Sequence, residues 1–71
     1  MSNNILSNEQ KAQIINQRLT VFASDKYVLE LNKKVAEMLG NTEELSQADE
    51  AIRVLDAGIA VYIQELSNLS E

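Results

Sequence analysis

Apolar residues recur at alternating spacings of three and four through the C-terminal part of the chain. This repeat runs for four heptads without a break, and it constrains the fold more than any other feature. Its members are Leu45, Ala48, Ile52, Leu55, Ile59, Tyr62, Leu66 and Leu69. Such a repeat is typical of a helix that packs along a seam against other helices. The pattern therefore predicts a helix over about residues 43–69.

An earlier helix is predicted over about residues 8–39. Ser7 and Gln10 have the spacing of a capping box, in which each side chain bonds the backbone N–H of the other residue. No Gly or Pro interrupts residues 11–39. Apolar residues come there in adjacent pairs every seven positions, which makes a stripe broad enough to contact more than one neighbour. The pairs are Ile14-Ile15, Val21-Phe22, Val28-Leu29 and Val35-Ala36.

Gly40-Asn41-Thr42 separates the two predicted helices. Gly suits the left-handed position that ends a helix, and Thr42 is the predicted N-cap of the next one. A connection this short makes the helices antiparallel neighbours. We therefore predict an all-α, antiparallel two-helix hairpin in which the numbers of paired residues sum to about 82, so that Val28 meets Leu55.

One domain is expected, covering residues 7–71, and the polar, unpatterned residues 1–6 are expected to form a flexible arm. Ser24-Asp25 offers an alternative, because Ser24 can cap a new helix and so divide the first helix into two. That division gives a three-helix arrangement. The paired apolar columns run through Ser24-Asp25 in phase, which favours one continuous helix.

The second predicted helix is apolar around most of its circumference, since only Arg53 and Asp56 interrupt residues 51–63. A helix of this kind is a buried helix, and one partner helix cannot cover it. The chain has 71 residues and neither Cys nor His. Disulfides and thiolate or imidazole zinc sites are therefore excluded, and oligomerisation is the remaining aid to stability.

We accordingly expect an oligomeric helical bundle in which two sets of residues on the second helix have different neighbours. The hairpin seam is assigned to Leu45, Ile52, Leu55, Ile59, Tyr62 and Leu66. The oligomer interface is assigned to a stripe of small residues beside that seam, Ala51, Val54, Ala57, Gly58 and Val61.

The net charge of −5 disfavours binding to duplex nucleic acid, whose partners normally carry a basic surface. No apolar run is long enough to span a membrane, and the N-terminus lacks the features of a signal peptide. We expect a cytoplasmic protein, or a virion-associated one if the source is viral. Residues 11–39 carry a net charge of +2 and residues 43–71 carry −6, which favours pairing of the two helices.

Two groups of charged residues are candidate binding sites. One basic group is a candidate anion- or nucleotide-binding face, with a tyrosine as a stacking surface: Arg18, Lys26, Tyr27, Lys33 and Lys34. Its simpler interpretation is a solvated face that complements the acidic second helix. Asp49, Glu50 and Asp56 surround Arg53 and are interpreted as a self-paired surface, because a metal site needs further ligands from a second helix or chain.

No catalytic constellation is visible, and we expect neither enzymatic activity nor a cofactor. The sequence favours a non-catalytic, oligomeric helical-hairpin interaction protein with a structural, adaptor or accessory role, and a phage or a bacterium is the hypothesised source. The alternative is a small inhibitor or ligand-sequestering oligomer that binds a host protein or a small anionic ligand.

Overall fold

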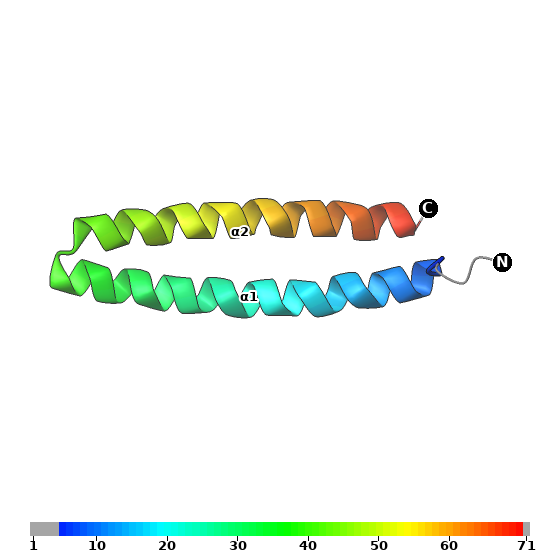
Figure 1. The fold of residues 1–71 in the computed structure, drawn as a ribbon, viewed down its shortest axis with the longest axis horizontal. Coiled ribbons are helices and arrows are strands. Elements are labelled where there is room, and N and C mark those ends of the chain that lie inside the picture. Colours follow the sequence, from blue (N-terminus) through cyan, green and yellow to red (C-terminus); the bar gives the residue numbers. More distant parts are fainter. Residues whose placement is uncertain (1–4, 71) are drawn as a thin grey trace.

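The computed structural model describes residues 5–70, and within that range it contains two helices, α1 (Asn8–Leu39) and α2 (Thr42–Leu69). The helices lie side by side and antiparallel, joined by a tight turn at one end (Figure 1). The molecule is a rod of 57 × 18 × 16 Å. The predicted hairpin is confirmed. Because α1 continues through Ser24-Asp25, the three-helix alternative is wrong.

The start of α1 and its end have the predicted caps. Ser7 Oγ accepts the backbone N–H of Gln10 at 3.0 Å, and Gln10 Oε1 accepts the N–H of Ser7 at 2.9 Å. Gly40 is left-handed, with φ of 67°. The next residue, Asn41, donates its N–H to the carbonyl oxygen of Ala36 at 2.9 Å, which satisfies a carbonyl at the end of the helix.

The N-cap of α2 differs from the prediction by one residue. Asn41, not Thr42, has the extended backbone of a cap, and its Oδ1 accepts the N–H of Glu44 at 3.1 Å. Asn is at least as good a cap as Thr, and the bond that ends α1 already fixes the backbone of Asn41. Thr42 therefore becomes the first helical residue.

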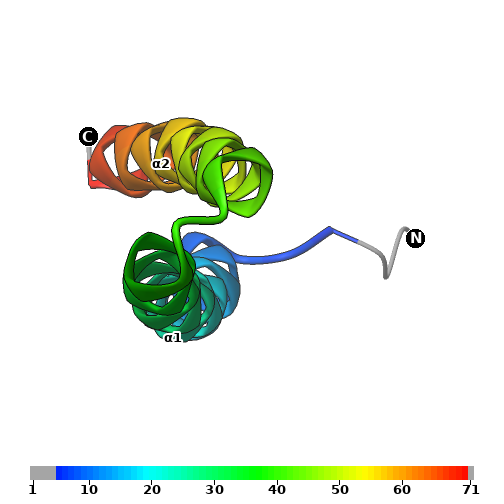
Figure 2. The ribbon, with the colours of Figure 1, turned by 90° about the vertical axis from the view of Figure 1, so that its left-hand side faces the viewer.

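The seam between the helices contains the whole predicted repeat of α2 and one member of each apolar pair of α1. The residues of α1 that face this seam are buried or half-buried: Ala12, Ile15, Leu19, Phe22, Lys26, Leu29, Lys33 and Ala36. The Phe22 and Tyr62 rings meet edge to face, with centroids 5.0 Å apart. Among residues 5–70, only Ala36 and Ala48 are buried. Seen along the rod, each helix has a neighbour on one side only (Figure 2).

Two ion pairs between the helices mark their register. Lys26 Nζ lies 2.7 Å from Asp56 Oδ1, and Lys33 Nζ lies 2.8 Å from Asp49 Oδ1. In both pairs the residue numbers sum to 82, so the predicted register is confirmed. A hydrogen bond to Asp56 and the charge of this carboxylate raise the pKa of Lys26 above its usual 10.5. Asp49 raises the pKa of Lys33 in the same two ways.

The expected N-terminal arm lies largely outside the described part of the chain, which begins at Ile5. Ile5 and Leu6 precede α1 and are exposed. Between residues 5 and 70, neither helix is apolar over enough of its length to be a candidate membrane span.

Candidate interaction surface

Each adjacent apolar pair of α1 divides between two surfaces. Its second member packs in the seam, whereas its first member points away from α2. These first members form one column at a spacing of seven, here called the outer column of α1: Ile14, Val21, Val28 and Val35. Their exposed fractions lie between 45% and 57%. The hairpin therefore covers only one column of the broad apolar stripe and leaves the outer column of α1 exposed.

The corresponding column of α2, at the same spacing, has apolar residues at its centre and amides at its ends. This outer column of α2 consists of Gln47, Val54, Val61 and Asn68. Val54 is 61% exposed and Val61 is 59% exposed. Full burial of an aliphatic side chain is worth about 1.5–3 kcal/mol, so covering the exposed part of each of these valines would add roughly 1–2 kcal/mol.

The two outer columns border the same long side of the rod. Val28 and Val54 line one surface pocket whose floor includes Leu29 and Leu55. Ile14 with Val61, and Val35 with Gln47, line two further pockets along the hairpin. We call the side lined by both outer columns the groove face.

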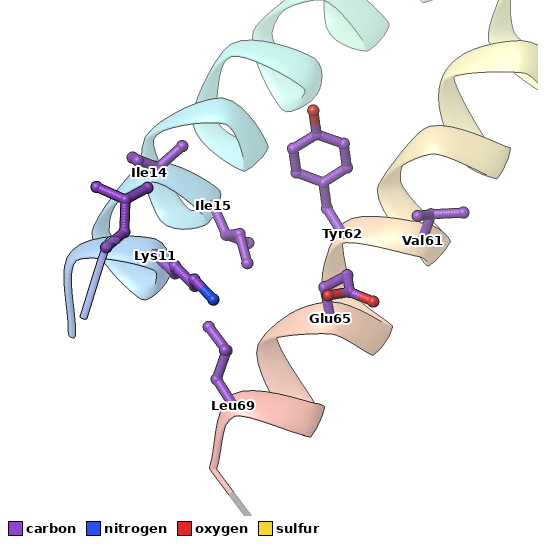
Figure 3. Close-up of a pocket in the computed structure, with 8 residues that line it drawn as sticks. Lys11, Ile14, Ile15, Val61, Tyr62, Glu65 and Leu69 are labelled. Atoms are coloured by element: carbon purple, nitrogen blue, oxygen red, sulfur yellow. The ribbon is translucent and has the colours of Figure 1, made fainter. Parts of the chain in front are cut away.

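Figure 3 shows the end of the groove face that is farthest from the turn. Ile15, Tyr62 and Leu69 project into the space between the helices. Ile14 and Val61 lie to either side of that space, on α1 and α2 respectively. The floor of the groove is thus made by seam residues and its walls by the outer columns.

Charged side chains bridge the two helices away from these pockets. The ion pairs Lys26–Asp56 and Lys33–Asp49 connect the two helices, and none of these four residues lines a pocket of the groove face. The hairpin therefore has a side bridged by charges and an apolar side. That asymmetry makes the groove face the candidate interaction surface.

The predicted interface residues fall into three positions. Val54 and Val61 lie in the outer column of α2, while Ala51 and Gly58 are half-buried between that column and the seam. Ala57 is exposed, and its heptad column contains Glu50 and Gln64, apart from the residues that line the groove. The outer column of α1 is not among the residues that the sequence predicts for an interface. The paired apolar columns of α1 nevertheless indicate that this helix contacts a second neighbour.

Gly58 lies in the middle of α2, and the hairpin itself gives no reason for a glycine there. A Cβ atom added at this position meets no atom within 4 Å. Glycine in a helix interior costs about 1 kcal/mol relative to alanine. Gly58 therefore weakens α2 without allowing any close contact with α1.

The five predicted anion-binding residues are divided among different contacts. Lys26 and Lys33 bind the two aspartates of α2, and the Arg18 guanidinium carbon lies 5.7 Å from the centre of the Phe22 ring. Lys33 lines a shallow pocket with Tyr27 and Lys34, and Glu30 and Glu37 line the same pocket. An anion site here remains a prediction, and these two carboxylates disfavour it.

Three acidic residues of α2 are paired with basic side chains. Glu50 binds Arg53 through two bonds, of 3.2 Å to Nε and 2.7 Å to Nη2, and Asp49 and Asp56 bind lysines of α1. Within residues 5–70, no three acidic side chains gather closely enough to hold a metal ion.

Comparisons of the chain with protein-family models, with curated proteins and with solved structures found no match.

Proposed function

We propose that this protein is a non-catalytic interaction protein that acts as a homo-oligomer, with the groove face buried between copies of the hairpin. The observation that carries the proposal is the position of the two outer columns. Six aliphatic side chains that are about half exposed lie on the one long side that the ion pairs leave free. Large uncovered apolar surfaces of this kind mark sites of protein association.

The exposed area of the chain supports association. The chain exposes 5520 Å². A compact monomer of 7.9 kDa exposes about 4,400 Å² by the scaling of surface with mass. The excess of about 1,100 Å² exceeds the roughly 800 Å² that each partner contributes to a standard stable interface. A single standard contact along the groove face would therefore remove most of this excess, about 800 of the 1,100 Å².

The small core supports the same conclusion. The two buried alanines among residues 5–70 contribute little hydrophobic stabilisation, and the remaining seam residues are only half-buried. Chains of this size supply only a small core, and oligomerisation is one of the ways in which those without disulfides or metals gain stability. We infer a structural, adaptor or accessory role in which the assembled bundle, not the single hairpin, is the working form.

A charge placed on the groove face tests the proposal. Val61→Lys places an ammonium group in the contact between copies, so the native mass measured by light scattering should fall to that of one chain. The matched control is Ala60→Lys, which adds the same charge at an exposed neighbouring position outside the pockets of the groove face. The control should keep the mass of the unmodified protein. Equal masses for both variants and the unmodified chain would contradict the proposal.

A further inference from the structure

We infer that the occupant of the groove face is a second copy of the hairpin, related by a two-fold axis perpendicular to the rod, with the two turns at opposite ends. This inference rests on the proposed self-association and specifies its geometry. It follows from the residue pattern of the outer columns together with the register of the hairpin.

Each outer column is apolar in a pattern that is symmetric about its own centre. On α1 the centre lies midway between Val21 and Val28, with Ile14 and Val35 at equal distances on either side. On α2 the centre lies midway between Val54 and Val61, and the two amides Gln47 and Asn68 are equally far from it.

The two centres lie at the same height along the rod. The ion pairs Lys26–Asp56 and Lys33–Asp49 place residues whose numbers sum to 82 opposite each other. By this rule Val28 is level with Val54, and these two residues line one pocket. One axis can therefore pass through both centres. Because both outer columns are symmetric about this one axis, the groove face is self-complementary, as an isologous contact requires.

Rotation about this axis brings α1 against α1 and α2 against α2 of the second copy. Val21 then meets Val28, and Val54 meets Val61. At the ends, Ile14 meets Val35 on α1, and Gln47 meets Asn68 on α2. Every aliphatic residue of the outer columns thus meets an aliphatic residue, and every amide meets an amide.

The other two-fold arrangement, with both turns at the same end, matches the columns less well. It places α1 against α2 at equal heights. Val21 then meets Val61 and Val28 meets Val54, but Ile14 meets Asn68 and Val35 meets Gln47. Two of the four kinds of contact therefore join an aliphatic side chain to an amide, which leaves the amide poorly solvated.

Gly58 is an independent observation in favour of the arrangement with opposite turns. It lies within one residue of the centre of the outer column of α2, where the two α2 helices cross. No atom of its own hairpin needs the space above it. A glycine at a crossing point allows two helix backbones to approach closely.

Charge opposes this arrangement. Residues 43–71 carry a net charge of −6, and opposite turns place α2 against α2 of the second copy. The arrangement is therefore carried by the aliphatic columns and by Gly58, not by charge. Asp25 of both copies lies near the axis, and this repulsion sets a limit on the stability of the pair.

Distances between spin labels test the arrangement, because the chain has no cysteine of its own. Ser46→Cys and Ala60→Cys are two full-length variants with labels in one exposed column of α2. From a rise of 1.5 Å per residue, opposite turns separate the two copies of residue 46 by about 35 Å along the rod, and those of residue 60 by about 8 Å. Pulsed electron paramagnetic resonance should find the first distance longer than the second by about 15 Å or more.

The outcomes separate this inference from the proposed function. A dimer in which both labels give equal distances would overturn the arrangement and leave self-association intact. If the unlabelled protein has the mass of one chain and the labels show no coupling, both the arrangement and the proposed self-association would be overturned. Circular dichroism of each labelled variant confirms that the hairpin is folded before the distances are compared.

Discussion

At the scale of single residues, Gly58 distinguishes most clearly between an isolated hairpin and an assembled one. In the isolated hairpin, Gly58→Ala adds a methyl group where no atom lies within 4 Å. The substitution would then stabilise α2 by about 1 kcal/mol. In the assembly, the same methyl group lies where two α2 helices approach each other.

We therefore expect Gly58→Ala to raise the dissociation constant of the dimer about tenfold, because overpacking of a close contact costs about 1–3 kcal/mol. The measurement is sedimentation over a dilution series, with helix content followed by circular dichroism. Ser67→Ala is the control, since it also improves helix propensity but lies in an exposed column outside the groove face. An unchanged or tighter dimer in Gly58→Ala would show that no helix packs closely there.

At the scale of the helices, much of the fold follows from local sequence. The capping box at Ser7, the left-handed Gly40 and the heptads of α2 each depend on a few neighbouring residues, and all are confirmed. The register followed from the length of the turn.

The face that α1 presents to α2 could not be predicted from its sequence. Each adjacent pair, such as Ile14-Ile15, offers two columns with the same period. The column that faces α2 also contains Lys26 and Lys33, which makes it less apolar than a seam is expected to be. These lysines fit because their alkyl stems cover the seam while their ammonium groups reach aspartates at its edge. That placement depends on α2, so α1 alone does not reveal it.

The two lysines also predict how the hairpin responds to alkaline pH. The aspartates raise the pKa of Lys26 and Lys33 above 10.5, so the folded state holds these protons more tightly than the unfolded state. Their contribution to stability is complete below pH 10.5 and is lost as the pH rises through the higher pKa of the folded state. We expect the urea midpoint to fall modestly over this range, because exposed ion pairs are weak.

The matched control for this pH effect is the double variant Lys26→Met and Lys33→Met. It keeps the alkyl stems in the seam, together with both tyrosines and the remaining lysines. Its urea midpoint should fall less between pH 9.5 and about 11.5, the range around the ordinary lysine pKa. An identical fall in the variant and the unmodified protein would assign the effect to other groups.

At the scale of the whole molecule, the hairpin is a rod with one side bridged by charges and one uncovered apolar side. The short turn sets how α1 and α2 align, the ion pairs mark this alignment, and it places the centres of the two outer columns at one height. Register within the hairpin thus determines whether the groove face can be self-complementary. Folding and assembly are expected to be coupled, because the seam alone buries so little apolar surface.

The most direct test of this account is the sedimentation-equilibrium mass of the unmodified 71-residue chain at micromolar concentration. The account predicts a mass twice that of the 7.9 kDa chain, which decreases toward 7.9 kDa on dilution together with loss of helix. A helical protein that keeps the mass of one chain at every concentration would contradict it.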